Sequence, residues 1–403
     1  MKLAKRTALC TLSPMRKFHP YAVEAEQQGK TIYHLNIGQP DLETPAAYFQ
    51  AVRDTADPVL AYAPSPGMPE LVSAVQAYYR GLGVSYEPGH ILITAGGSEA
   101  LTFLMLCILD DGDEVLIPEP FYPNYNTFVR AAGGVIRPIP TTPAEGYRFA
   151  DRARLEALIT DRTRAILFSD PGNPTGAVLT AEERRILADV ALEHGLYLVA
   201  DEVYREFTYG GQGPATMAAL EDLSDHLVLI DSVSKRFSAC GARVGCLISK
   251  NQRLMAEALK LCQARLSVAT LDQQAAAALY RTPSGYFDAV RQEYRSRRDT
   301  VLRKLRAIPG VICAEPQGAF YVMAALPIRD ADHFQQWLLT DFSDHDETVM
   351  FAPGGPFYAT PGRGRNEIRI AYVLKPAALE RAMELLALGL KSYQELEPFD
   401  PTA

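Results

Sequence analysis

Residues 165–201 read AILFSDPGNPTGAVLTAEERRILADVALEHGLYLVAD, and the pattern of this stretch indicates the class of fold. Two short apolar runs, 165–169 and 196–200, have the composition of buried strands. Between them, residues 180–194 show helical periodicity, and a Thr-x-x-Glu capping box marks the first turn. A strand, a helix and a second strand in this order predict two parallel strands joined by a covering helix.

The same alternation continues on both sides of this stretch. Further apolar runs that we interpret as strands lie at 91–95, 114–118, 135–139, 227–231 and 244–248. Helical patterns at 98–110 and 121–133 separate some of them. The sequence therefore predicts an α/β fold with a mostly parallel seven-stranded sheet covered on both faces.

The C-terminal third has a different pattern. A charged helical stretch at 284–308 precedes strand candidates at 311–315, 318–325, 348–352 and 367–373, with helices at 330–341 and 376–393. This order is typical of a smaller α+β domain. We expect an N-terminal arm with part of the small domain at 1–45, a large domain at 46–295 and the rest of the small domain at 296–403.

The composition is that of an ordinary soluble globular protein. Of the 403 residues, 48% are apolar and 22% charged, and the formal net charge is −8. Without basic clusters or an apolar run of about 20 residues, we expect neither nucleic-acid nor membrane binding. The six cysteines form no C-x-x-C pair, so we expect no metal site and a cytoplasmic location. The expected partners are small molecules or a second copy of the chain.

Polar motifs follow four of the predicted strands. In open parallel sheets, ligands bind beyond the carboxyl ends of the strands, so these motifs mark the candidate site. They are Gly96–Glu99, Asp170–Gly176, Asp201–Tyr204, and Ser232–Lys235 followed by Arg243.

Lys235 is the candidate nucleophile. The Ser-x-Ser-Lys motif places its amine near two hydroxyls, and Arg243 adds a second cation. A lysine that is desolvated beside cations loses its proton readily and can form an imine with an aldehyde. A lone lysine after a strand is more often an ordinary surface residue, but the flanking serines and arginine favour the functional interpretation.

Asp201 is the candidate electrostatic partner of a cofactor ring. Burying its carboxylate at a strand end is costly unless it meets a cation or a donor. A protonated pyridine nitrogen would serve, and such a ring stabilises a carbanion at a substrate α-carbon. An ordinary helix N-cap remains the alternative for this residue.

The turn Gly96-Gly97-Ser98 opens a predicted helix, where free backbone N–H groups attract phosphate. A bare strand-to-helix turn is an equally common use of such a sequence, but Ser232, Ser234 and Arg243 offer further donors for an anion.

Three side chains could contact the ring of a cofactor. Asn173 and Tyr204 could each donate to a ring hydroxyl, and Tyr122 could stack on the ring. Core packing is the alternative for Tyr122.

Taken in order, these motifs resemble the class I and II aminotransferase family of fold type I pyridoxal-5′-phosphate (PLP) enzymes, and within it the branch that contains bacterial aspartate aminotransferases. The resemblance covers nearly the whole chain. Its motifs are LNIGQPDLETP, LAYAPSPGMPEL, TAGGSEA, EPFYPNY, NPTG, DEVY, SVSK, GAFY and RIAYVL.

The resemblance implies specific roles for the cofactor-binding residues. Lys235 would be the Schiff-base lysine and general base, Asp201 would pair with the pyridine nitrogen, and Tyr122 would stack on the ring. Asn173 and Tyr204 would bind the 3′-oxygen. The phosphate would be held by Gly97, Ser98, Ser232 and Arg243, with Tyr62 reaching it from the other subunit of a homodimer.

For the substrates, an amino acid and a 2-oxo acid, the resemblance implies that Arg369 binds the α-carboxylate, with Gly38 and Asn173 beside it. Aspartate-specific relatives often carry lysine where this chain has Ser98, so the side-chain pocket is unassigned. Arg265 lies near a region that can supply a distal arginine, which favours aspartate or glutamate. A solvated Arg265, with aromatic or other neutral donors, is the alternative.

Two other functions are compatible with such a fold. One is a PLP-dependent lyase that catalyses β- or γ-elimination, since one fold hosts many reactions. The other is the ligand-sensing domain of a transcription regulator, but no basic helix-turn-helix segment accompanies it here. We therefore expect an aminotransferase.

Overall fold

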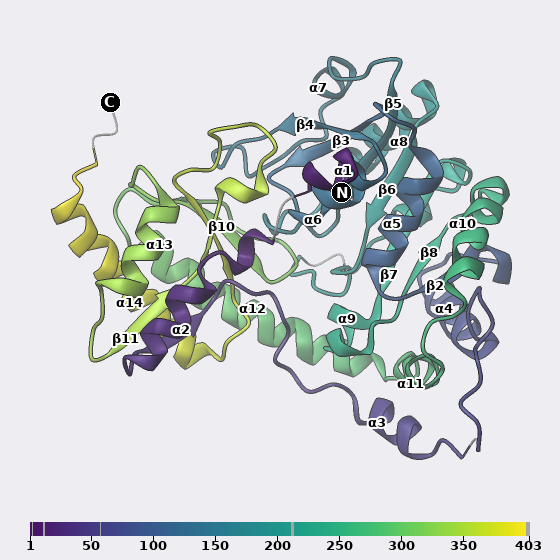
Figure 1. Cartoon of the computed structure of the whole chain (residues 1–403), viewed down its shortest axis with the longest axis horizontal. Helices are drawn as coiled ribbons and strands as arrows, with labels where there is room; N and C mark the ends of the chain where they lie inside the picture. Colours follow the sequence, from purple (N-terminus) through teal and green to yellow (C-terminus); the bar gives the residue numbers. More distant parts are fainter. Residues whose placement is uncertain (2, 11–12, 57, 211–212, 400–403) are drawn as a thin grey trace.

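A computed structural model describes residues 1, 3–10, 13–56, 58–210 and 213–399. Its centre is a seven-stranded sheet (Figure 1). The strand order across this sheet is β2 (Ile91–Thr94), β8 (Gly245–Ile248), β7 (Leu227–Ser232), β6 (Tyr197–Asp201), β5 (Thr163–Ser169), β3 (Glu114–Glu119) and β4 (Val135–Pro140).

One strand of this sheet runs against the others. β8 pairs antiparallel with both β2 and β7, whereas the pairs from β7 across to β4 are parallel. β2 therefore points the same way as β7, and six carboxyl ends meet at one edge. The predicted α/β fold with a mostly parallel sheet is confirmed.

Both faces of the sheet are covered, because each strand sends alternate side chains to opposite sides. In β5, Ile166 and Phe168 join one apolar cluster, while Ala165 and Leu167 join another. The first cluster contains helices α4 (Pro69–Gly81), α8 (Ala181–His194) and α11 (Thr270–Leu279). The second contains α5 (Gly97–Ile108), α6 (Asn124–Ala131) and α10 (Gln252–Arg265).

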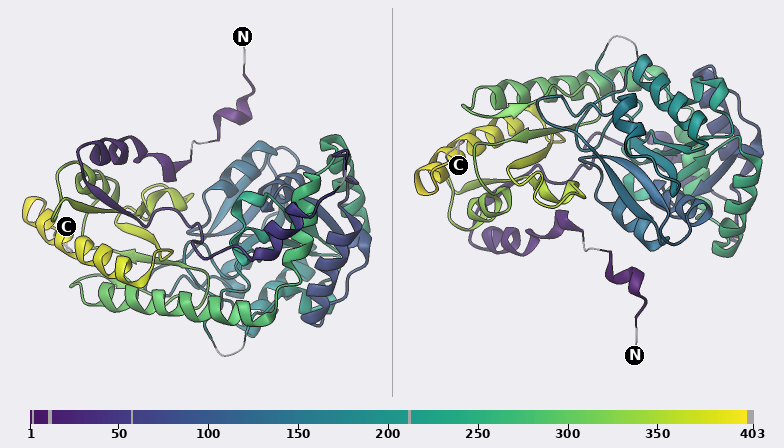
Figure 2. Two further views of the ribbon diagram at one scale, coloured as in Figure 1. Left: turned by 90° about the horizontal axis from the view of Figure 1, so that it is seen from below. Right: turned by 90° about the horizontal axis from the view of Figure 1, so that it is seen from above.

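A smaller α+β part surrounds an antiparallel sheet with its own apolar cluster. Its strand order is β12 (Ala352–Pro353), β13 (Glu367–Ala371), β10 (Tyr321–Ala325) and β9 (Ile312–Cys313). Helices α12 (Ser284–Arg306) and α14 (Pro376–Leu396) pack side by side along it (Figure 2), and α13 (Ala331–Thr340) completes the cluster.

The N-terminal segment belongs in space with this smaller part. β1 (Thr31–His34) pairs in parallel with β11 (Glu347–Met350), and α2 (His19–Gln27) packs on α13. The domain boundaries inferred from the sequence stay a prediction. The remaining elements are α1 (Lys5–Ala8), η1 (Pro14–Arg16), α3 (Ala46–Arg53), η2 (Pro88–His90), α7 (Arg152–Glu156), η3 (Met217–Ala219), η4 (Glu221–Leu223), α9 (Val233–Arg236), η5 (Cys240–Ala242) and η6 (Gly355–Phe357).

Two predicted strands differ from the structure for identifiable reasons. The run 318–325 forms a strand only from Tyr321, because Ala319 has a left-handed backbone with φ 54° that no strand accommodates. The run 348–352 is divided between β11 and β12, which belong to different sheets. Among the described residues, no helix is both long and apolar enough to cross a membrane.

The capping box of α8 generates a first prediction. The Thr180 hydroxyl accepts from the Glu183 N–H at 3.1 Å, and the Glu183 carboxylate accepts from the Thr180 N–H at 2.7 Å. Thr180→Ala should lower the free energy of unfolding by about 1 kcal/mol, because one N–H of the first turn loses its acceptor. Urea denaturation measures this, with Thr180→Ser as the control that keeps the cap. Equal stability of the alanine and serine variants would contradict the assignment.

Candidate active site

A cavity of about 390 Å³ lies at the carboxyl ends of the parallel strands. It brings together eleven of the thirteen residues predicted from the sequence. These are Gly38, Gly97, Ser98, Tyr122, Asn173, Asp201, Tyr204, Ser232, Lys235, Arg243 and Arg369. Most follow strands of the large sheet, whereas Arg369 lies on β13 of the small one.

Lys235 lies in the short helix α9 directly after β7. Ser232 caps this helix, and its hydroxyl accepts from the Ser234 N–H at 3.2 Å. The Lys235 amine donates to the Gly38 carbonyl at 2.9 Å and lies 3.6 Å from the Cys240 sulfur. The amine is therefore held within the cavity rather than in open solvent.

Asp201 ends β6 and is 7% exposed. Burial raises the pKa of its carboxyl to about 6, although hydrogen bonds from the Tyr125 hydroxyl, at 2.8 Å, and the Val203 N–H, at 3.4 Å, act against it. A cation placed beside this carboxyl would favour its ionised form. Asp201 is thus suited to hold a protonated ring nitrogen.

An anion cradle lies where β2 meets α5. Arg243, in a left-handed conformation with φ 52°, donates to the Ala95 carbonyl at 3.2 Å. A Cβ on Gly96 would lie only 2.4 Å from the Arg243 Nη2, so glycine is required for the guanidinium to approach the turn. Gly97 and Ser98 begin α5 and line the cavity, and the N–H groups in the first turn of a helix are free to bind an anion.

Gly245, on the antiparallel strand β8, allows the cradle and the lysine turn to approach each other. It pairs with Thr94 on one side and Ser232 on the other. A Cβ there would lie 2.7 Å from the Gly96 carbonyl carbon and 2.8 Å from the backbone carbonyl oxygen of Asp231. A side chain at residue 245 therefore has no room between the turn after β2 and strand β7.

Arg369 reaches the cavity from the smaller part and is 4% exposed. Its guanidinium donates to the Asn173 side-chain oxygen at 3.1 Å and to the Asn36 carbonyl at 2.6 Å. It lies over the rings of Tyr321 and Phe357, with centroid distances of 4.6 and 4.9 Å. These contacts fix the direction of the guanidinium, as carboxylate binding requires.

The two tyrosines assigned to the cofactor ring also line the cavity. The Tyr204 hydroxyl is 2.9 Å from the Tyr321 hydroxyl, and burial raises the pKa of Tyr204 well above its ordinary value. The Tyr122 hydroxyl accepts from Asn124 at 2.8 Å, and its ring stands nearly perpendicular to that of Tyr125.

Two predicted residues lie outside the cavity lining. Tyr62 is 80% exposed in the loop before α4. Arg265 is turned into the protein: its Nη2 donates to the Ile93 carbonyl at 3.1 Å, and its Nε is 3.5 Å from the Glu99 carboxylate. The structure does not bring Arg265 to the cavity of its own chain.

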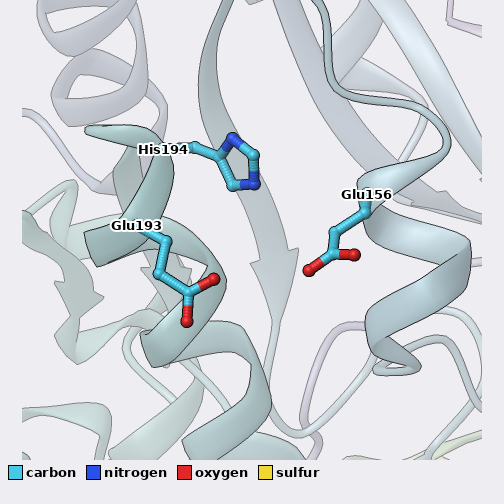
Figure 3. A group of neighbouring side chains, drawn as sticks. All are labelled: Glu156, Glu193 and His194. Atoms are coloured by element: carbon cyan, nitrogen blue, oxygen red, sulfur yellow. The ribbon is translucent and has the colours of Figure 1, made fainter.

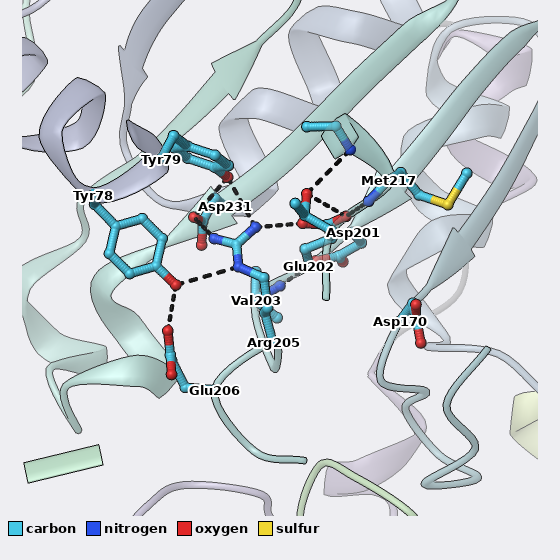
Figure 4. Close-up of polar contacts among 12 residues, drawn as sticks. Tyr78, Tyr79, Asp170, Asp201, Glu202, Val203, Arg205, Glu206, Met217 and Asp231 are labelled. Atoms are coloured by element: carbon cyan, nitrogen blue, oxygen red, sulfur yellow. Dashed lines mark hydrogen bonds and ion pairs between the residues drawn. The ribbon is translucent and has the colours of Figure 1, made fainter. Parts of the chain in front are cut away.

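A buried ionic network underlies the site, and Figure 4 shows the part of it around Arg205 and Asp231. The fully buried Asp231 carboxylate accepts from Arg205 at 2.8 Å, from Arg236 at 2.6 Å and from the Tyr79 hydroxyl at 3.0 Å. Arg205 also pairs with Glu202. The network therefore joins the segment after Asp201 to the segment that carries Lys235.

Some lining residues were given no role from the sequence. Tyr125, which donates to Asp201, lies one helical turn after Tyr122 in the quoted EPFYPNY motif, and Tyr321 ends the quoted GAFY motif. Their motifs were visible, but their partners come from distant strands. Arg16 and Cys240 also line the cavity, without any pattern that would have singled them out.

Figure 3 shows a separate group at the ends of α7 and α8, formed by Glu156, Glu193 and His194. All three are exposed, and Arg152 pairs with both carboxylates at 3.0 and 2.7 Å. The arginine already compensates these charges, so we assign no metal to this surface.

The residues of the cavity fit PLP. The Gly96 cradle under Arg243 suits a phosphate, Asp201 suits a pyridine nitrogen, and the Lys235 amine suits an aldehyde. The fold and the cavity together define a PLP-dependent enzyme. The model of the family "Aminotransferase class I and II" matches residues 30–386. The chain belongs to the class I and II aminotransferase family.

Similar proteins support the same class. The chain is 33% identical to an aspartate aminotransferase from Geobacillus stearothermophilus, across 95% of this chain and 98% of that protein. It is 34% identical to an aspartate/prephenate aminotransferase from Thermus thermophilus, across 91% and 93%.

Among solved structures, an aspartate aminotransferase from Thermus thermophilus with maleate has a TM-score of 0.88 at 30% identity, covering 96% of this chain and 100% of that one. An alanine aminotransferase from Pyrococcus furiosus also has a TM-score of 0.88, at 29% identity, with 97% and 100% covered. The protein is a PLP-dependent aminotransferase.

The raised pKa of Asp201 predicts a pH effect in the cofactor-free protein. Because the folded-state pKa is about 6 against an ordinary 3.8, folding favours the neutral acid, and this stability is lost as pH rises from about 4 to 6. The free energy of unfolding of wild type, relative to Asp201→Asn, should fall by about 2 kcal/mol between pH 4 and 7. Urea denaturation across this range measures it, and parallel pH profiles would contradict it.

Proposed function

We propose that this cavity transfers the amino group of an L-amino acid to a 2-oxo acid, with Lys235 moving the proton at the substrate α-carbon. One observation carries the proposal: the Lys235 amine, the buried Asp201 carboxylate and the Arg369 guanidinium line the same cavity. Bound PLP supplies an aldehyde that captures the amino group and a ring that withdraws electrons from the α-carbon.

The chain's own residues perform the proton transfers. With PLP bound, the Lys235 amine would take the proton from the substrate α-carbon, and its conjugate acid would return a proton later in the transfer. Asp201 would keep the ring nitrogen protonated through its negative charge. Ser98, Gly97, Ser232 and Arg243 would hold the phosphate, and Tyr122, Asn173 and Tyr204 would position the ring.

Arg369 selects α-amino acids through their α-carboxylate. Its two Nη atoms are oriented by Asn173 and Asn36, and a bidentate pair with a carboxylate would fix the α-carbon near the Lys235 amine. Gly38 lies beside it, where a Cβ would lie 1.8 Å from the Tyr321 hydroxyl. A larger residue at this position would displace that tyrosine.

For the substrate class we propose aspartate or glutamate as donor and 2-oxoglutarate as acceptor. The similar proteins named above include aspartate and alanine aminotransferases, so the shared fold is compatible with both dicarboxylic and neutral donors. Dicarboxylates need a second cation at the cavity, because an unpaired buried carboxylate costs several kcal/mol.

We propose a homodimer with shared active sites. Tyr62 is 80% exposed, and its neighbours Val59 and Leu60 are 72% and 65% exposed, which makes an apolar run on the surface. A second copy would cover this run and receive Tyr62 at its phosphate. We also propose a cytoplasmic location, supported by six cysteines that are all unpaired.

Covalent labelling tests the role of Lys235. Borohydride reduction of the holoenzyme should fix the cofactor on the peptide that contains Lys235, because only an imine at this amine is reduced to a stable bond. Lys235→Ala should bind PLP without turnover. Peptide mass spectrometry of the reduced protein locates the label. A label on another lysine would refute the assignment.

Subunit complementation tests the shared site. Lys235→Ala and Tyr62→Ala chains should each be poorly active, since each lacks a group at every site. Mixed dimers should recover activity, because one of their two sites contains both Lys235 and Tyr62. The measurement is activity after co-refolding and separation by tags. Mixed dimers as inactive as both parents would show that each site is built from one chain.

A further inference from the structure

The end of β3 carries a buried carboxylate that the proposed reaction does not use. Glu119 is 1% exposed and lies three residues before Tyr122, which is assigned to the cofactor ring. Its Oε2 accepts from two consecutive backbone N–H groups, those of Ala359 and Thr360, at 3.1 Å each. Its Oε1 lies 3.5 Å from the Arg363 guanidinium. All three partners lie between β12 and β13 of the smaller part.

Residues 354–366, which join β12 to β13, form what we call the connecting loop. This loop contacts the arginine assigned to the substrate α-carboxylate, because the Phe357 ring centroid lies 4.9 Å from the Arg369 guanidinium carbon. The Phe357 carbonyl accepts from the Phe121 N–H at 2.8 Å, so the loop also reaches the segment that follows β3. A displacement of the loop would therefore move an aromatic ring that lies against Arg369.

A second buried carboxylate holds the loop from the opposite direction. Glu367 begins β13 and accepts from the Tyr358 hydroxyl of the loop at 2.8 Å and from the Tyr147 hydroxyl of the larger part at 2.9 Å. It lies two residues before Arg369, so both side chains project from the same face of the strand. Each part of the molecule thus sends one carboxylate to the boundary beside Arg369.

Building on the proposed transaminase function, we propose that Glu119 is a positioning residue for binding of the substrate α-carboxylate. By holding the connecting loop at the end of β3, Glu119 keeps the Phe357 ring against the Arg369 guanidinium and fixes the direction in which that guanidinium meets a carboxylate. A planar guanidinium binds a carboxylate well only when the two groups are aligned. Glu119 is not among the described residues that line the active-site cavity, so its effect passes through Arg369.

Asp113 offers a matched control beside the other end of the same strand. It directly precedes β3, is 8% exposed, accepts from the Asp110 N–H at 2.9 Å and pairs with Arg164 at 3.0 Å. Its partners are of the same kind as those of Glu119, a backbone N–H and an arginine, but both belong to the larger part. Asp113→Asn therefore removes a comparable buried charge without a contact to the connecting loop.

The first measurement separates KM from kcat in the holoenzymes. Glu119→Gln should raise KM for aspartate about tenfold and change kcat less than about threefold, because carboxylate binding is misaligned while the reacting centre is intact. Arg363→Gln, at a partly exposed side chain, removes the cation beside Glu119 without altering a buried group and should raise KM in the same direction. Asp113→Asn should leave KM within about twofold of wild type.

An unchanged KM in both Glu119→Gln and Arg363→Gln would overturn the role of Glu119. An equal increase of KM in Asp113→Asn would overturn it too, because any buried charge would then have the same effect.

A double-mutant cycle tests whether the effect passes through Arg369. Calorimetric titration of the holoenzyme with maleate measures carboxylate binding without turnover. Glu119→Gln should weaken maleate binding about tenfold beside Arg369, but less than about twofold in an Arg369→Lys background, because an ammonium has no plane to align. Equal losses in the two backgrounds would overturn the positioning role. Intact maleate binding with no transamination of any amino acid by wild type would instead overturn the proposed function.

Discussion

The geometry of the site depends on one buried carboxylate, Asp231, held between the guanidiniums of Arg205 and Arg236. Burial alone would raise the pKa of Asp231, but the two arginines overcome this and hold the pKa below its usual range. Charges buried this deeply are tolerable only when paired and hydrogen-bonded, and removal of one partner typically costs about 3–5 kcal/mol. The pairing therefore fixes where the ends of β6 and β7 stand relative to each other.

The relative position of the ends of β6 and β7 matters because Asp201 and Lys235 lie beside the two segments that the network joins. Arg205 follows Asp201 by four residues, and Arg236 follows Lys235 directly. A reaction that moves a proton at a defined atom tolerates little displacement of its base. The network supplies this rigidity beneath the cavity, so the residues within it remain free to contact ligands.

Local sequence patterns predicted much of this architecture. They did not predict the contacts between segments that are distant in the sequence. The apolar runs located all seven strands of the large sheet, because side-chain burial on both faces needs continuous apolar residues. The polar residues at strand ends located part of the cavity lining, because ligands in open parallel sheets bind beyond the carboxyl ends of the strands. Arg265 shows what a sequence pattern does not give. The region of the chain in which it lies suggested a place beside the substrate, whereas in the structure its guanidinium lies beside the Glu99 carboxylate. Arg16 lines the cavity because the N-terminal segment continues into α2, which packs on α13. The residues around position 16 do not indicate this long-range contact.

Gly245 marks a position where the close approach of backbone segments excludes any side chain. At this position the backbones of β2 and β7 come so close to β8 that any side chain would push the anion cradle away from the lysine turn. The cavity lining also includes Ser13 and Arg16, from an N-terminal segment whose following helix α2 packs on α13 of the smaller part. Substitutions in this segment leave the contact between the anion cradle and the lysine turn unchanged, so a mutant library aimed at new substrates should vary these residues and keep residue 245 as glycine.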